Sequence, residues 1–174
     1  DSRLGVDRLR ERYGVGASTI REALSLLSAE ALVIAEGQRG FRVAPMSVDD
    51  LRDLSAARTL LETHALRESI MNGDDEWEAG VVAAFHRLSR AQERLDGGLE
   101  GAAVEWEARN REFHQALVSR CDSRWIIFML EPLDHHSERY RRAALTSGST
   151  DRDVRAEHEA LVDAALARDA DTAV

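Results

Sequence analysis

The chain has 174 residues, of which 44% are hydrophobic and 32% charged, so it can bury a core in one ordinary domain or in two small ones. Its net charge of −9 is unevenly distributed: residues 1–45 carry seven Arg and six acidic residues, whereas the remainder carries 16 Arg and 26 acidic residues. Because the acidic remainder repels phosphates, contact with nucleic acid is excluded outside the first quarter of the chain. The lack of an apolar run of about 18 residues excludes a membrane span, and the single Cys121 excludes an internal disulfide and favours the reducing cytoplasm.

The first 46 residues predict a winged helix-turn-helix. Gly14-Val15-Gly16 gives a tight turn between two helical segments, and two short alternating segments follow as a β-hairpin. The helices are expected at residues 6–13 and 17–31, and the strands at 32–35 and 40–44. This order of elements indicates a DNA-binding domain over residues 1–46 that lacks its first helix.

From Ser47 onward the pattern is helical only. A capping box at Ser47 and Asp50 opens this part, and the helices are expected at residues 48–71, 75–95, 100–120, 124–146 and 151–168. Pro132 should kink the fourth helix or end its first segment, a new helix should start at Asp171, and Trp77 and Trp125 should pack in the bundle. The predicted fold class is mainly α, with an antiparallel all-α bundle of about six or seven helices over 47–174, expected to continue beyond Val174.

Three of the predicted helices carry polar residues on or beside their apolar stripe, namely Arg58 in helix 48–71, Asn110 and His114 in helix 100–120, and His158 in helix 151–168. Polar residues on a core-facing stripe need an explanation. Asn110 and His114 project from one face a turn apart, and His158 can complete three ligands for a divalent ion such as zinc or nickel. Arg58 is then a buried cation that needs an anion, and its planar fork suits a carboxylate.

The same residues have simpler interpretations. A single His on an apolar face is more often a hydrogen-bonded core residue, and Arg58 can pair with Glu62 one turn on. If these residues do bind a metal ion, the protein could instead be a metal-dependent all-α hydrolase. Glu112 or Glu157 would then be the general base, although neither lies on the inward stripe of its helix. A metal sensor without an organic effector is a second alternative.

The candidate DNA-binding residues lie at the start of the second helix and at the tip of the hairpin, namely Ser18, Thr19, Arg21, Arg39 and Gly40. Ser18 and Thr19 suit phosphate oxygens at the positive end of the helix dipole, and Arg21 has the reach for a guanine or a phosphate. The alternative interpretation is that the Arg residues form a solvated surface.

Segments in both parts of the chain resemble the GntR family of bacterial transcription regulators, in its FadR-type branch. YGVGASTIREALSLLSAEALV and EGQRGFRVAP resemble the family's recognition helix and wing, and NREFHQAL and EHEALVDAAL resemble its helical effector-binding domain. The resemblance implies that Asn110, His114 and His158 bind a metal ion, with a fourth ligand beyond Val174. It also implies that Arg58 holds an effector carboxylate, and that Arg139 and Tyr140 line the pocket.

The resemblance further implies a cytoplasmic homodimer that binds palindromic operator DNA and a small organic acid, with no membrane partner, and that acts as a repressor. The segment GDDEWEAGVVAAFHRL is similar to dicarboxylate-responsive members of the branch, so glutarate or a similar acid is expected. Two positions depart from the family pattern. Asn110 stands where the family most often has a charged Asp, which weakens metal binding, and Ala17 stands where an Arg commonly opens the recognition helix.

Overall fold

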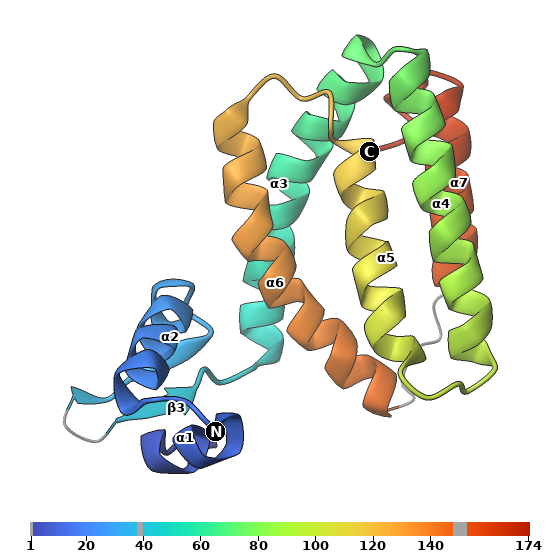
Figure 1. Ribbon diagram of the computed structural model, residues 1–174. Coiled ribbons are helices and arrows are strands. Elements are labelled where there is room, and N and C mark those ends of the chain that lie inside the picture. Colours follow the sequence, from blue (N-terminus) through green and yellow to red (C-terminus); the bar gives the residue numbers. More distant parts are fainter. Residues whose placement is uncertain (1, 38–39, 148–152) are drawn as a thin grey trace. The chain divides into compact units, whose positions relative to one another are not determined.

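The computed structural model describes residues 2–37, 40–147 and 153–174 (Figure 1). The chain divides into two compact units, Asp1–Asp50 and Leu51–Val174, which we call the winged unit and the helical unit. Among the described residues, no helix has the length and apolar character needed to cross a membrane.

In its described residues, the winged unit contains two helices and a small antiparallel sheet. The helices are α1 (Val6–Tyr13) and α2 (Ala17–Ala29), and the strands, in the sheet order β1-β3-β2, are β1 (Arg3–Leu4), β3 (Phe41–Val43) and β2 (Val33–Ala35). Gly14 ends α1 in the left-handed conformation, at φ 65°, which glycine adopts without steric cost. The core is formed by Ile20, Leu24 and Val33, with Leu4, Val6, Leu9 and Phe41 packed against it.

The short strand β1 was not predicted from the sequence. Its two residues pair with β3 in the register Arg3 to Arg42 and Leu4 to Phe41. Two residues are too few to show an alternating pattern, so only the pairing with β3 defines them as a strand. The predicted hairpin of β2 and β3 is present, with Val33 opposite Val43.

The helical unit contains five helices in the part of the chain that the structure describes. They are α3 (Val48–Asn72), α4 (Asp75–Asp96), α5 (Ala102–Leu117), α6 (Arg124–Ser147) and α7 (Val154–Leu166). The mainly helical fold class with a small wing sheet is confirmed, with five helices in the described part of the bundle where six or seven were expected. One reason is that α6 runs through Pro132 without interruption, and another is that no helix begins at Asp171, where residues 170–172 form a turn.

The helix α6 changes direction along its length, as Figure 1 shows. Pro132 lies inside it and has no backbone N–H to donate, which is the usual cause of such a bend. Near its start, Trp125 is 60% exposed and not packed in the bundle as the sequence suggested. Its ring stacks edge-on against Phe128, at 5.9 Å between centroids, and lies beneath the guanidinium of Arg124.

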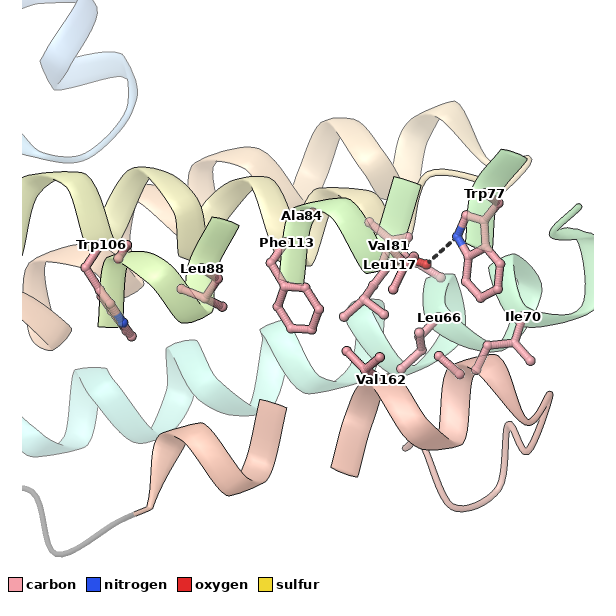
Figure 2. Close-up of a cluster of buried hydrophobic side chains, with 14 residues drawn as sticks. Leu66, Ile70, Trp77, Val81, Ala84, Leu88, Trp106, Phe113, Leu117 and Val162 are labelled. Carbon is pink, nitrogen blue, oxygen red and sulfur yellow. Dashed lines mark hydrogen bonds between the residues drawn. The ribbon is translucent and has the colours of Figure 1, made fainter. Parts of the chain in front are cut away.

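The core of the helical unit is a row of apolar side chains between α3, α4, α5 and α7 (Figure 2). The antiparallel pair α4 and α5 supplies most of it, with Trp106 at one end of the row and Trp77 at the other (Figure 2). The buried residues of α4 recur at alternating steps of four and three, namely Trp77, Val81, Ala84, Leu88 and Ala91. The Trp77 indole Nε1 donates a hydrogen bond to the carbonyl of Leu117, at 3.3 Å, which fixes the start of α4 to the end of α5.

Gly73, between α3 and α4, approaches Trp77 so closely that no side chain fits. A Cβ at this position comes within 2.4 Å of the Trp77 ring and 2.6 Å of the Arg168 guanidinium. We expect Gly73→Ala to lower the free energy of unfolding by about 1–3 kcal/mol, because the packed indole must move. Urea unfolding followed by Trp fluorescence measures the loss. Gly80→Ala is the control: its Cβ meets nothing within 4 Å, so an equal loss there contradicts the steric explanation.

Candidate functional site

The inward face of α5 carries the polar residue that the sequence singled out. Asn110 is 2% exposed and lies on the same face as Phe113 and Leu117, which are also buried. His158 is buried on α7, among Val162 and other small apolar residues. The helical spacing that placed both side chains on core-facing stripes is therefore observed.

The folded helices bring His114 of α5 close to His158 of α7. Their ring centroids lie 5.6 Å apart, at an interplanar angle of 73°. Phe113 packs edge-on against both imidazoles, with centroid distances of 5.5 Å to His114 and 5.2 Å to His158. Two imidazoles from two helices thus converge beside one buried aromatic ring, with Asn110 one turn before His114 on α5.

Glu62 of α3 orients the imidazole of His114. Nδ1 of His114 lies 3.0 Å from Oε1 of Glu62, and Nε of Arg58 lies 3.0 Å from the other carboxylate oxygen. Burial raises the pKa of Glu62, but the hydrogen bonds and charge interactions with His114 and Arg58 outweigh burial and lower the pKa to about 2. Glu62 is therefore a carboxylate at neutral pH.

This arrangement fits a metal ion. A metal-binding His commonly donates its second ring N–H to a carboxylate, which fixes the tautomer and leaves the other nitrogen as the ligand. The contact between Glu62 and His114 has that form, in which Nε2 would be the ligand atom. Within residues 2–37, 40–147 and 153–174, no three His, Cys, Asp or Glu side chains gather closely enough to hold an ion, so a site at the two imidazoles would need the amide of Asn110 as its third ligand.

The predicted effector residues occupy different surroundings. Arg58 is paired with Glu62, as the simpler interpretation of the sequence proposed, and its Nη2 lies 3.9 Å from Oδ1 of Asp134 on α6. Arg139 and Tyr140 are half-buried on α6. None of the three lines the cavity described next, so their role as effector contacts stays a prediction.

A cavity of about 200 Å³ opens beside His114 and Glu62. Thr59 and Thr63 of α3 add hydroxyl groups to its lining, and the remaining walls are apolar side chains. A cavity of this size is suited to a small molecule and not to a drug-sized ligand.

In the winged unit, α2 presents its predicted DNA-contacting residues to solvent. Ser18, Thr19 and Arg21 are exposed, whereas Ile20 between them is buried in the core. No side chain caps the start of α2 at Gly16, which leaves its first N–H groups for an acceptor such as phosphate. The exposed face and the helix start therefore suit contact with DNA.

The hairpin of the wing depends on glycine. Gly40 has φ 90° and Gly37 has φ 55°, and the amide of Glu36 donates to the carbonyl of Gly40 at 2.8 Å. Arg39, the other predicted wing contact, lies outside the described residues. Gly40 is thus a turn residue that sets the shape of the wing, and any contact it makes to DNA is through its backbone.

Family models match both units of the chain. The model described as "Bacterial regulatory proteins, gntR family" matches residues 1–43, and the FCD domain model matches residues 53–174. The chain belongs to the GntR family of bacterial regulatory proteins. As a GntR regulator with an FCD domain, it is a DNA-binding transcription regulator, and it has the operator DNA and effector partners of that family.

Two curated relatives cover nearly all of the chain. The HTH-type transcriptional regulator BphR of Paraburkholderia xenovorans is 51% identical over 98% of the chain and 69% of its own length. The HTH-type transcriptional repressor GlaR of Escherichia coli is 39% identical over 97% of the chain and 78% of its own length. These relatives are regulators and not enzymes, so the hydrolase alternative is wrong.

Solved structures share the fold. A GntR family member from Pseudomonas syringae pv. tomato is 27% identical, with a TM-score of 0.59, over 98% of the chain and 68% of its own length. Escherichia coli McbR/YncC is 22% identical, with a TM-score of 0.78, over 99% of the chain and 79% of its own length. At this identity the second match is a match of fold alone.

The structure of this GntR regulator adds charged residues near the site that sequence reasoning missed. Glu107 is 1% exposed on α5, and its carboxylate lies 3.0 Å from Nη2 of Arg141 on α6. Glu107 stands three residues before Asn110, so its place on the inward face was readable from the helical spacing. Asp134 and Arg111, which also meet near Arg58, gave no such signal because they meet across helices.

Proposed function

We propose that this GntR regulator is a repressor whose helical unit binds a small carboxylate with the help of a divalent metal ion. Asn110, His114 and His158 hold the ion, zinc or nickel being the best suited to two imidazoles and an amide oxygen. Acid binding favours one arrangement of the dimer over another and so changes its affinity for operator DNA. The repressor assignment follows the name of the relative GlaR.

The observation that carries the proposal is the contact of Glu62 with Nδ1 of His114, at 3.0 Å, with the ring of His158 5.6 Å from that of His114. A core histidine needs only a hydrogen-bond partner. Here one imidazole is oriented by a carboxylate that is held ionised, and a second buried imidazole lies next to it, which supports a metal site over two structural histidines.

The neutral Asn110 supports an acidic effector. With an amide and two neutral imidazoles as ligands, a divalent ion keeps its whole positive charge and has open positions for further ligands. A carboxylate supplies that missing negative charge. The cavity beside His114 is large enough for a small acid, and the hydroxyl of Thr59 can donate a hydrogen bond to a carboxylate oxygen, whereas that of Thr63 already donates to the Thr59 carbonyl.

Homodimerisation is part of the proposal. A helix-turn-helix dimer presents two recognition helices to half-sites about one DNA turn apart, which a palindromic operator provides. Operator duplexes enriched by the protein from a random-sequence pool test this step. We expect palindromic sequences, and enrichment of a single unrepeated half-site contradicts the dimer.

The function is tested by removing metal from the purified chain with a chelator and then titrating zinc or nickel, glutarate and the enriched duplex. We expect glutarate to bind tightly only when metal is present and to change DNA affinity. If metal alone controls DNA binding, the protein is a metal sensor. If neither metal nor any acid changes DNA binding, the proposal is wrong.

The orienting role of Glu62 gives a specific prediction. We expect Glu62→Gln to lower zinc affinity about 10–100-fold, because the neutral amide no longer polarises the His114 imidazole. Calorimetric titration of zinc into the metal-free protein measures it. Glu112→Gln is the matched control and should leave zinc affinity unchanged. The Glu112 side chain is 42% exposed on α5, where it forms ion pairs with Arg109 of the same helix and with Arg87 of α4. Unchanged zinc affinity in Glu62→Gln contradicts the metal site.

A further inference from the structure

One side of the first half of α6 is apolar and exposed. Trp125, Phe128 and Met129 are 60%, 63% and 42% exposed. Because Phe128 and Met129 stand three and four residues after Trp125, the three side chains lie on one side of the helix. The rings of Trp125 and Phe128 also contact each other edge-on, so the surface is continuous. We call these three residues the α6 patch. Contiguous apolar patches on soluble proteins mark interaction sites.

The opposite side of the same segment packs inside the helical unit. Ile126 and Leu130 are partly buried against its core. Residues 125–130 contain no charged or polar side chain apart from the indole N–H, so this segment of α6 is apolar on all sides. A helix that is apolar all round is normally buried all round. No part of the chain that the structure describes covers the α6 patch, so a second molecule must bury it.

Two charged residues at the ends of the α6 patch favour a second copy of this chain as that molecule. Arg124 and Glu131 are exposed and stand seven residues apart, so they lie on the same side of α6, two turns from each other. When two α6 helices pack antiparallel about a two-fold axis beside Phe128, Arg124 of each copy faces Glu131 of the partner subunit. Parallel packing instead brings like charges together. The α6 patch is therefore complementary to itself, as a two-fold symmetric contact requires.

The charge of the surrounding surface argues against an anionic partner. Residues 46–174 carry 26 acidic residues and 16 Arg, so they repel nucleic acid and anionic lipid. A second copy carries the same negative charge and is repelled over most of its surface. Residues 125–130 carry no charge, so two copies can meet there without that repulsion.

We infer that the α6 patch is a contact surface between two copies of this chain, in which α6 packs antiparallel to α6 of the partner subunit. Apolar contacts at the centre and two pairs of Arg124 with Glu131 at the ends hold the copies together. This inference rests on the homodimer of the proposed function and adds the surface that forms it. Two helical turns are a small contact beside the about 1,600 Å² of a stable interface, so we expect a Kd in roughly the micromolar range.

Sedimentation equilibrium of the whole chain, at concentrations on both sides of the Kd, tests the apolar centre. Phe128→Glu brings two like charges together at the two-fold axis and should raise the Kd of the dimer at least about tenfold. Leu99→Glu is the matched control: Leu99 is 59% exposed outside α6, so this variant should keep the wild-type Kd. Urea unfolding well below the Kd, where the chain is monomeric, should give both variants the stability of wild type.

Reversal of the charges tests the antiparallel arrangement. Arg124→Glu replaces both ion pairs with repulsion and should raise the Kd about tenfold at low salt. The double variant Arg124→Glu with Glu131→Arg restores both pairs with exchanged signs, and its Kd should return to that of wild type. The difference between the single and the double variant should shrink in about 1 M salt, which screens exposed charges.

The outcomes separate this inference from the proposed function. If wild type is monomeric at every concentration, the homodimer of the proposed function fails, and this inference fails with it. If wild type dimerises and Phe128→Glu dimerises equally well, the inference is wrong while the proposed homodimer stands. A double charge variant that stays as weak as Arg124→Glu contradicts the antiparallel contact.

Discussion

Replacing Arg141 with alanine is expected to lower the free energy of unfolding of the helical unit by about 3–5 kcal/mol at neutral pH. Arg141 is the partner of Glu107, whose carboxylate lies 3.0 Å from Nη2 and 3.1 Å from Nε of the guanidinium. Glu107 is 1% exposed, so water cannot replace the lost partner. A buried charge without compensation is among the most destabilising changes in a protein.

The loss should depend on pH. Burial raises the pKa of Glu107 above its unfolded value of 4.5, although the charge and hydrogen bond of Arg141 oppose the shift. Without Arg141 the pKa rises further. The pKa of Glu107 in the folded variant is then above its unfolded value of 4.5. The free energy of unfolding of the variant is therefore highest below pH 4.5, where Glu107 is protonated in both states, and it falls as the pH rises through the folded-state pKa. The Arg141→Ala variant should therefore be closest to wild type in mildly acidic solution.

Urea unfolding from about pH 5 to pH 8, followed by Trp fluorescence, measures this. All three tryptophans of the chain lie in the helical unit, so the signal does not report the winged unit. Adding Glu107→Gln to the Arg141→Ala variant should recover most of the loss and remove the pH dependence. Arg142→Ala, at a half-exposed position, should cost less than about 1 kcal/mol. A pH-independent loss in Arg141→Ala contradicts the explanation.

Phe113→Ala should also destabilise the helical unit by about 3–5 kcal/mol, the usual range for a fully buried aromatic residue. Phe113 is 0% exposed and is the largest fully buried side chain of the described residues. Its ring packs against Phe85 at 5.8 Å and against the imidazoles of His114 and His158. Its removal leaves a cavity at the centre of the row in Figure 2, where four helices meet.

The matched control is Phe128→Ala. The chemical change is the same, but Phe128 is 63% exposed on α6, so its truncation should change stability by less than about 0.5 kcal/mol. Urea unfolding of both variants by Trp fluorescence gives the comparison. A loss below about 1 kcal/mol in Phe113→Ala contradicts the described core, since no well-packed site tolerates such a cavity. The same variant should also bind zinc more weakly, because Phe113 packs against both imidazoles.

Local patterns in the sequence determined the elements and the inward residues. The order helix, turn, helix and hairpin gave the winged unit, because each of these elements has a short-range signature. The spacing along α5 placed Asn110 on the buried face, and the spacing of α7 did the same for His158. The pair Arg58 and Glu62 was also readable, since residues four apart on a helix are neighbours.

Only the tertiary structure decided which of these helices face each other. It thereby also decided which charged side chains form ion pairs between helices. Asp134 meets arginines from three helices, and Glu107 meets Arg141, although no spacing along the chain relates them. The exposure of Trp125 and the strand pairing of Arg3 are decided in the same way. The physical reason is that helical periodicity determines which face of a helix is buried, whereas the helix that packs against this face depends on how the helices are arranged. Ion pairs between helices follow from that arrangement, so spacing along the chain does not predict them.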